Sequence, residues 1–169
     1  MNILFAQIFA LFSSLCLLVS FWQRKRKNIL NLQILDSTFD IIQYVLLGAY
    51  TGCLISFLGA MRAYVFKKSS NKLCLILFIT LYIIASVLTF SSYISFLPLF
   101  AAIIYTLVVW NKEEKNIRFF SIFVFMLWLV YDILVKAYVS SITDVILIIS
   151  NSIAFYKLDN KGVNPNEWK

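Results

Sequence analysis

A series of long apolar stretches, broken only by short polar segments, is the feature that most constrains this chain. The stretches are about 17–21 residues long, the length that lets a helix cross the ~30 Å hydrocarbon core of a bilayer. Hydrophobic residues make up 62% of the sequence and charged residues 14%, against about 45–50% and about 25% in a soluble domain. Transmembrane strands would alternate in polarity over about ten residues, and this pattern is not seen. The sequence therefore predicts an all-α membrane protein.

Seven such stretches follow one another, so we expect a single transmembrane domain over residues 1–169. The first stretch is followed, rather than preceded, by the basic run Arg24–Lys27. A cleaved signal peptide has the opposite order, so we expect a retained helix. The segment Lys157–Lys169 is polar and forms a predicted tail outside the bilayer. The predicted spans are Ile3–Phe21, Asn28–Leu47, Tyr50–Phe66, Leu73–Phe90, Ile94–Trp110, Asn116–Ala137 and Val139–Tyr156.

The lysine and arginine residues gather in alternate loops, and this pattern predicts the orientation of the chain. The loops after the first, third and fifth spans are basic, for example at Arg24–Lys27 and Lys67–Lys72, whereas the other loops carry almost no Lys or Arg. Basic loops tend to stay in the cytoplasm, so we expect the N-terminus outside and the C-terminus in the cytoplasm. The same placement accounts for the net charge of +7, and we expect no nucleic acid partner.

Two loop segments resemble each other and indicate an internal repeat. When FWQRKRKNI (Phe21–Ile29) is placed over VWNKEEKNI (Val109–Ile117), Trp22 meets Trp110 and both segments end in Lys-Asn-Ile. The same register sets the first three spans over the last three, which predicts seven transmembrane helices in a 3+1+3 parallel-repeat arrangement. Chance similarity between apolar helices is the alternative. The predicted parts are a first three-helix unit at 1–66, a linker helix at 73–90, a second three-helix unit at 94–156 and a cytoplasmic tail at 157–169.

Five short motifs carry a resemblance to a known family. They are LLGAYTG (Leu46–Gly52), AMRAYV (Ala60–Val65), WLVYD (Trp128–Asp132), SNSIAFY (Ser150–Tyr156) and NKGVNP (Asn160–Pro165). In this order and spacing, they resemble the YgjV-type bacterial inner membrane protein family, whose function is unassigned. The 3+1+3 plan also looks like that of the SWEET and PQ-loop (MtN3-like) superfamily. The resemblance implies a multi-pass protein of the bacterial inner membrane.

The chain departs from this resemblance in two respects. The resemblance implies an Asn three residues before an Arg in both third helices, but here one helix keeps only Arg62 and the other only Asn151. SWEET-type carriers also resemble one another in helix prolines that let the units rock, whereas this chain has only Pro98 and Pro165. Neither proline-hinge gating nor sugar transport is therefore carried over.

A polar face on the second span is the first candidate site. Gln33, Asp36, Asp40 and Gln43 recur at three- and four-residue intervals, so they share one side of a helix. Folding the hairpin between spans two and three brings Arg62 level with Asp36, and we predict contact between these two side chains. The group is either half of a site that binds a polar or cationic solute or relays a proton, or an ion pair that locks two helices together.

The second half of the chain carries a matching set of polar residues. Folding the last hairpin puts Asp144 level with Asp132, with Trp128 nearby and Asn151 two turns deeper on the face of Asp144. These residues are either the second half of the site or ordinary membrane features. In the second case Trp128 and Lys136 belong to an interfacial belt and Asn151 forms a hydrogen bond between helices.

The sequence argues against enzymatic chemistry. Histidine is absent, which removes the commonest general base. Cys16, Cys53 and Cys74 lie in apolar runs without metal-type spacing, and we interpret them as packing residues. We therefore expect no catalytic residues, no metal and no cofactor.

Two functions remain. The first is a small-solute transporter of SWEET-like architecture, facilitated or driven by an ion gradient. Its expected partners are the lipid bilayer, a small polar solute and, in a homo-oligomer, further copies of itself. The second is a non-transporting accessory or structural protein whose buried charges are ion pairs between helices. A water-reachable cavity that touches Asp40 and Asn151 would favour the transporter. The predicted solute-binding residues are Asp36, Asp40, Gln43, Arg62, Trp128, Asp132, Asp144 and Asn151.

Overall fold

The computed structural model describes residues 2–23, 25–69, 71–90, 92–111 and 113–157, and its regular structure in these ranges is entirely helical. All of the predicted tail except Lys157, together with the NKGVNP motif, lies outside the described residues. The helices are α1 (Asn2–Phe21), α2 (Arg26–Leu47), α3 (Tyr50–Lys68), α4 (Lys72–Leu88), the short 3₁₀ helix η1 (Tyr93–Ser95), α5 (Phe96–Trp110), α6 (Glu114–Leu134) and α7 (Tyr138–Phe155).

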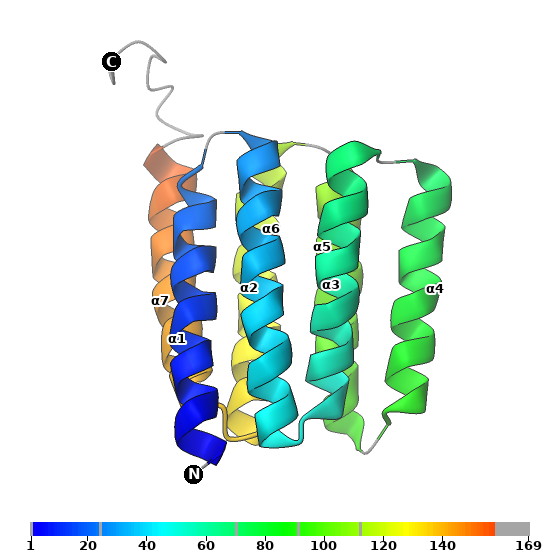
Figure 1. Cartoon of the computed structure of the whole chain (residues 1–169). Helices are drawn as coiled ribbons and strands as arrows, with labels where there is room; N and C mark the ends of the chain where they lie inside the picture. Colours follow the sequence, from blue (N-terminus) through cyan, green and yellow to red (C-terminus); the bar gives the residue numbers. More distant parts are fainter. Residues whose placement is uncertain (1, 24, 70, 91, 112, 158–169) are drawn as a thin grey trace.

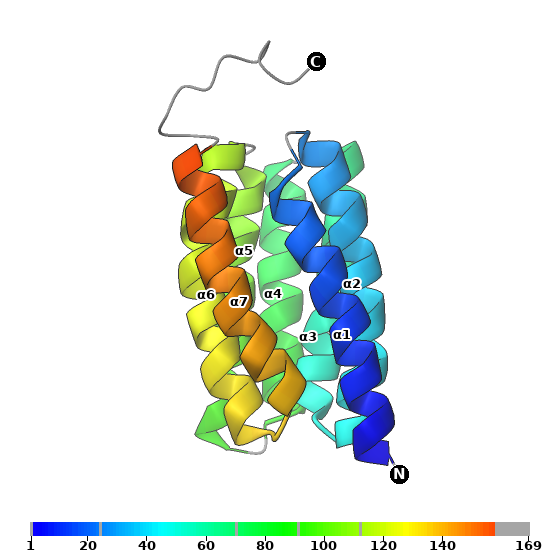
Figure 2. The ribbon, with the colours of Figure 1, turned by 90° about the vertical axis from the view of Figure 1, so that its left-hand side faces the viewer.

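The seven α-helices run up and down in two layers (Figure 1). Helices α1, α2 and α3 form one layer and α7, α6 and α5 the other, as the view along the layers shows (Figure 2). Between the layers, α1 packs against α7 at one edge and α3 packs against α5 toward the other. Helix α4 packs on α3 and α5, at the edge away from α1 and α7.

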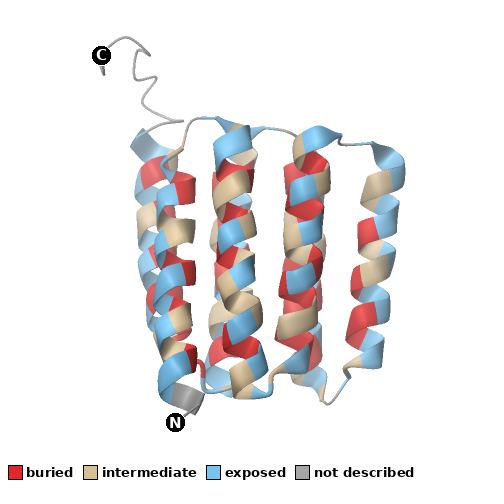
Figure 3. Cartoon of the chain, in the orientation of Figure 1, coloured by how far each residue is buried: buried red, intermediate tan, exposed pale blue. Residues whose placement is uncertain are grey.

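Polarity in this bundle is reversed relative to a soluble protein. Large apolar side chains such as Phe12, Phe57 and Ile142 point outward and are about half exposed or more, at 50%, 48% and 63%. Buried polar side chains lie on the inner faces of the helices, as on α2 at Gln33 and Asp36. Figure 3 shows buried and exposed residues alternating along each helix. This distribution suits a protein in a lipid bilayer, because lipid tails offer polar groups no hydrogen bonds.

Four of the described helices are long and apolar enough to cross a membrane by length and composition. Helix α4 is apolar but slightly shorter. Helices α2 and α3 fall outside this group because polar residues such as Asp36, Asp40 and Arg62 interrupt their apolar sequences. Since Asp36 and Arg62 are buried inside the bundle, the outer faces of these two helices stay apolar. The qualifying segments are Leu4–Phe21, Tyr93–Trp110, Lys115–Leu134 and Tyr138–Phe155.

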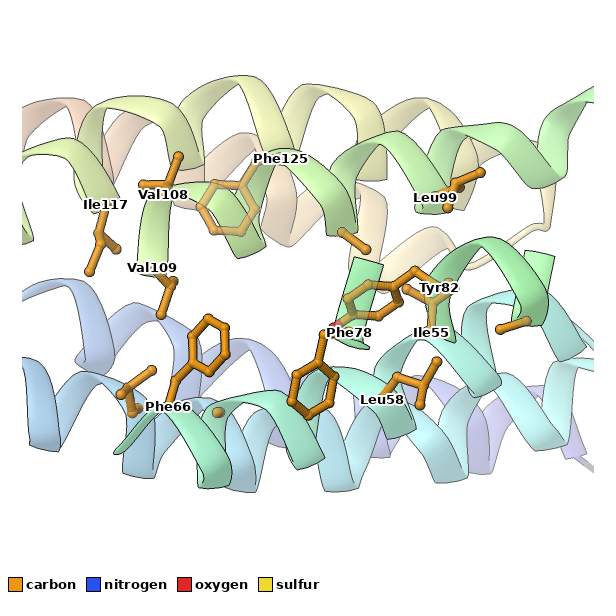
Figure 4. Packing of buried hydrophobic residues seen from close by; sticks show 14 of the residues in the cluster. Ile55, Leu58, Phe66, Phe78, Tyr82, Leu99, Val108, Val109, Ile117 and Phe125 are labelled. Atoms are coloured by element: carbon orange, nitrogen blue, oxygen red, sulfur yellow. The ribbon is translucent and has the colours of Figure 1, made fainter. Parts of the chain in front are cut away.

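One end of the bundle carries the lysine-rich loops α1–α2, α3–α4 and α5–α6, and we call it the basic end (Figure 1). Just inside this end, the apolar side chains of Leu30, Phe66, Val109 and Ile117 are at most 1% exposed. They come from the first or last turns of α2, α3, α5 and α6 and belong to the main apolar cluster. The close-up shows Phe66, Val109 and Ile117 between the two layers (Figure 4). Apolar packing therefore fills the bundle at its basic end.

The turns that join α2 to α3 and α6 to α7 have the same backbone conformation. Gly48 and Lys136 both adopt the left-handed conformation, with φ of 70° and 62°. The N–H of Ala49 donates to Tyr44 O at 2.9 Å, and the N–H of Ala137 donates to Asp132 O at 2.8 Å. In the register that pairs Trp22 with Trp110, Gly48 corresponds to Lys136 and Ala49 corresponds to Ala137.

Most helix boundaries differ from the sequence-based expectation by one to three residues, and two of these differences have a clear cause. Helix α6 ends at Leu134 rather than Ala137, because the left-handed backbone of Lys136 ends the helix and Ala137 already precedes α7. Helix α5 begins at Phe96, after the 3₁₀ turn, which places Pro98 in its first turn. The first N–H groups of a helix have no partner within it, so Pro98 removes no hydrogen bond and introduces no kink there.

Close packing at the start of α3 generates a stability prediction. A Cβ atom on Gly52 would lie 3.0 Å from the hydroxyl of Tyr131 and 3.1 Å from Cγ of Tyr44, whereas one on Gly59 would meet only Ser37 Oγ, at 3.6 Å. Both substitutions to alanine gain similar helix propensity. The difference in stability between the two variants therefore measures the crowding at position 52. We expect Gly52→Ala to be less stable than Gly59→Ala by about 1–3 kcal/mol, measured by denaturant unfolding in detergent. Equal stabilities would contradict this packing.

Candidate functional site

A cavity lies between the two layers and is lined by side chains from all seven α-helices. Its empty volume is about 840 Å³, a figure that includes open space at its mouth. Four carboxyl groups and one guanidinium group face it. They belong to Asp36, Asp40, Asp132, Asp144 and Arg62.

The first two carboxyl groups share one serine hydroxyl. Oγ of Ser13, in the middle of α1, lies 2.6 Å from Oδ1 of Asp36 and 2.6 Å from Oδ1 of Asp40. Asp36 and Asp40 are one turn apart on α2, so both reach the same point on α1. Asp36 is 7% exposed. The polar stripe predicted on α2 therefore faces the interior, and its nearest partner is α1.

The other two carboxyl groups lie on the α6–α7 hairpin. Asp132 and Asp144 both line the cavity, and the charge of Asp132 acts on Asp144, which agrees with the proximity that the folding of the last hairpin predicted. The hydroxyl of Tyr44 on α2 also donates to Oδ1 of Asp132 at 2.8 Å. Asp132 is 2% exposed and Asp144 7%. This pair therefore ties the second triplet of helices to the first.

The predicted contact between Arg62 and Asp36 is absent. Both side chains line the cavity, but the Arg62 guanidinium donates from Nη1 to Thr106 Oγ1 at 3.1 Å. It also lies over the ring of Tyr105, with Cζ 4.8 Å from the ring centroid. Helix α3 turns this arginine toward α5, which packs against it, rather than back toward α2. The ion-pair prediction was wrong because it considered one hairpin and not the helix that lies opposite.

Aromatic rings form one wall of the cavity. Tyr44 stacks on Trp128 with ring centroids 5.9 Å apart, and Tyr131 meets both rings edge-on. Trp128 and Tyr44 line the cavity, while Tyr131 is 3% exposed and accepts a hydrogen bond from the Gly52 N–H at 3.0 Å. These rings belong to the interior of the bundle rather than to an interfacial belt. Lys136, in contrast, is exposed at a turn.

Two predicted site residues do not line the cavity. Gln43 is fully buried and its Nε2 donates to Ser140 Oγ at 2.5 Å, which joins α2 to α7. Asn151 is also fully buried, and its Nδ2 donates to the backbone oxygen of Arg118, which joins α7 to α6. Asn151 therefore makes the hydrogen bond between helices that was its alternative interpretation. The cavity reaches Asp40 but not Asn151.

Sequence reasoning missed several polar groups of the cavity. Ser13 and Ser14 lie within an otherwise apolar stretch, and Ser14 donates to Thr143 Oγ1 across the α1–α7 contact at 2.7 Å. Tyr105 accepts a hydrogen bond from Gln33 Nε2. The adjacent serines in the middle of an apolar span were the available signal, because polar side chains at that depth face the protein interior. Tyr105 gave no such signal.

Two arginines close the basic end by bonding to backbone carbonyls of several helices. Arg26 on α2 donates to Phe66 O at 3.0 Å and Val109 O at 3.2 Å, at the last turns of α3 and α5. Arg118 on α6 is 3% exposed and donates to Phe21 O at 3.2 Å and to Gln23 O at 3.1 Å. Carbonyls at helix C-termini lack partners within the helix. Each arginine therefore binds across the seam between the two layers.

Four buried polar atoms of the cavity lining lack partners. They are Oε1 of Gln33, Nε of Arg62, the hydroxyl of Tyr82 and Oδ2 of Asp144, on side chains that are at most 7% exposed. A buried polar atom without a hydrogen bond costs about 1–3 kcal/mol. The cavity therefore offers an incoming molecule one donor, two acceptors and one hydroxyl that can donate or accept. Within the described ranges, His, Cys, Asp and Glu form no group of three or more that could hold a metal ion.

These features define a polytopic helical membrane protein with a charged internal cavity. A family model for a bacterial inner membrane protein, Imp-YgjV, matches residues 4–162. The chain therefore belongs to this family, and its location is the bacterial inner membrane. No curated protein and no solved structure matches the chain.

The hydrogen bond from Tyr44 to Asp132 generates a second stability prediction. Tyr44→Phe removes the hydroxyl and leaves Oδ1 of Asp132 without this donor, so we expect a loss of about 1–3 kcal/mol in the free energy of unfolding. Tyr64→Phe is the matched control, because Tyr64 is 52% exposed on the outer face of α3, and it should change stability little. Denaturant unfolding in detergent measures both. If the two variants lose equal stability, the Tyr44–Asp132 bond does not join the layers.

Proposed function

We propose that this protein carries a small polar solute across the bacterial inner membrane and holds it in the cavity between α1–α3 and α5–α7. The observation that carries the proposal is the cavity lining, with four carboxyl groups and one guanidinium inside a bundle whose outside is apolar. Charged side chains at membrane depth are costly, and they are characteristic of solute and ion pathways.

We further propose a 3+1+3 parallel-repeat plan of SWEET or PQ-loop type, with α4 as the linker. Its support is the matching conformation of the turns at Gly48 and Lys136, in the register of the two tryptophan-containing loops. In the same register α1 corresponds to α5 and α7 to α3. The contact between α1 and α7 therefore corresponds to the contact between α5 and α3. In parallel-repeat transporters the site lies near the midplane, between the repeats. The cavity has this position relative to the two triplets.

The orientation that we propose places the basic end in the cytoplasm and the N-terminus outside. Packing of Leu30, Phe66, Val109 and Ile117 and the bonds of Arg26 and Arg118 then close the cavity on the cytoplasmic side. Release of the solute into the cytoplasm requires these cross-layer contacts to open. Since the two triplets are separate layers, a rocking motion of one against the other provides the opening.

The accessory-protein alternative depended on ion pairs between helices. In the part of the chain that the structure describes, the four acids of the cavity make no ion pair. Asp36 and Asp40 bond to Ser13, and Asp132 bonds to Tyr44. Buried ion pairs hold helices together only when both partners are present. The alternative therefore loses its main physical argument. A homo-oligomer is compatible with either function.

Alternating access to the cavity tests the carrier directly and needs no known solute. In a variant with Cys16, Cys53 and Cys74 replaced by alanine, Ser56→Cys places a thiol in the cavity wall. A carrier exposes this position to each side of the membrane in turn. We therefore expect a charged, membrane-impermeant methanethiosulfonate reagent to modify it from either side, in right-side-out spheroplasts and in inverted vesicles.

The neighbouring residue supplies the control. Phe57 is 48% exposed on the outer, lipid-facing surface of α3, so Phe57→Cys should react from neither side. Labelling of Ser56→Cys from one side only, or from neither, would contradict the carrier and favour the accessory protein.

A further inference from the structure

We propose that the cavity is a proton-binding site, in which the pairs Asp36–Asp40 and Asp132–Asp144 each hold one shared proton at neutral pH. Only the consequence for transport rests on the proposed function: the carrier then moves protons together with, or in exchange for, its solute. At each pair, the count of hydrogen-bond donors and acceptors requires one proton.

At the first pair, one hydroxyl serves two carboxyl groups. A serine hydroxyl carries one proton, so it donates one hydrogen bond, while its oxygen accepts others. Oγ of Ser13 lies 2.6 Å from an oxygen of each carboxyl group, a distance typical of hydrogen bonds in which one partner is ionised. If both aspartates were ionised, one of these contacts would join two acceptors without a proton. A proton on Asp36 or Asp40 supplies the missing donor.

At the second pair, the carboxyl groups of Asp132 and Asp144 both line the cavity, and their charges repel each other when both are ionised. Ionised carboxylates only accept hydrogen bonds, so neither group can donate to the other unless one of them carries a proton. Tyr44 already donates to Oδ1 of Asp132. With both groups ionised, Oδ2 of Asp144 has no donor and is buried. Two carboxyl groups that share a site in this way commonly share one proton.

The surroundings provide little positive charge that would favour full ionisation. Arg62 is the basic residue in the described lining, and it is held against Thr106 and Tyr105 rather than against a carboxyl group. The other titratable groups that face the pairs are uncharged phenols and thiols. By element, the groups are Cys16 of α1, Tyr44 of α2, Arg62 of α3, Tyr82 of α4, Tyr105 of α5, Tyr131 of α6, and the carboxyl groups themselves on α2, α6 and α7.

The atoms without partners indicate that the cavity is built to receive a ligand. The shared proton satisfies Asp144, which leaves an acceptor on Gln33, a donor on Arg62 and the hydroxyl of Tyr82, all more than nine-tenths buried in the lining. A polar solute or a water molecule with both a donor and an acceptor satisfies the atoms of Gln33 and Arg62. Protons held nearby can then exchange with that solute or water.

The proton count restricts how the carrier moves. With all four acids ionised, the cavity would hold a net charge of about three negative units, including Arg62, and the two shared protons reduce this to about one. Every proton that leaves converts a carboxylic acid into a carboxylate. A bundle with extra buried carboxylates is costly to reorient within the membrane. We therefore expect the cavity to change the side of the membrane to which it opens only after protons return to the carboxylates or after a cationic solute replaces them.

Infrared spectroscopy of the full chain in lipid nanodiscs tests the proton site, because a protonated carboxylic acid has a C=O stretching band that shifts in D₂O. We expect this band in the wild-type protein at pH 7. The double variant Asp36→Asn, Asp40→Asn should lose about half of its intensity, and so should Asp132→Asn, Asp144→Asn. Glu113→Gln is the control, because Glu113 is exposed, and it should leave the band unchanged.

Absence of the band from the wild type at pH 7 overturns the proposal, and so does a band that both double variants retain. If a double variant fails to fold, the wild-type spectrum still decides. The result is independent of the carrier test. A wild-type band together with one-sided labelling of Ser56→Cys would keep the proton site and reject the carrier. Two-sided labelling without a band would keep the carrier and reject the proton site.

Discussion

A carboxyl group inside a bilayer must find its hydrogen-bond partners within the protein, and this requirement organises the interior of the bundle. Asp36 and Asp40 meet Ser13 of α1, while Asp132 meets Tyr44 of the opposite layer. Lipid offers none of these partners. The helices that carry acids must therefore turn them inward, and the helices that carry the partners must face them. The two layers and the position of the cavity follow from this pairing.

The same requirement makes the interior of the bundle differ from its basic end. At the basic end, Phe66, Val109 and Ile117 fill the space with apolar side chains, and arginines bind the carbonyls at the ends of α1, α3 and α5. Deeper in the bundle, acids and aromatic rings replace this packing and leave a volume that apolar residues do not fill. The carrier and proton proposals both start from this contrast between a tightly packed end and a polar interior.

The sequence predicted the number of helices, the inward face of α2 and the proximity of Asp132 and Asp144, because each depends on helical periodicity and on one tight turn. It did not predict that Arg62 turns to Thr106, that Ser13 joins two acids, or that Gln43 lies outside the cavity, and it left the bond of Asn151 between helices as an alternative. The contacts of Gln43 and Arg62 join helices that do not follow one another in the chain. Periodicity shows which face of a helix is polar, but it does not show which helix lies opposite.

The central claim is that the polar faces of the two layers meet across a seam, and a disulfide between α1 and α7 tests it most directly. Oγ of Ser14 lies 2.7 Å from Oγ1 of Thr143, so cysteines at both positions are close enough to bond. In a variant without the native cysteines, oxidation in native membranes should join Ser14→Cys to Thr143→Cys in nearly every molecule. The pair Leu15→Cys and Ile142→Cys, whose native side chains point outward, should stay reduced. Cross-linking of the second pair and not of the first would place the serine face toward lipid and contradict the account.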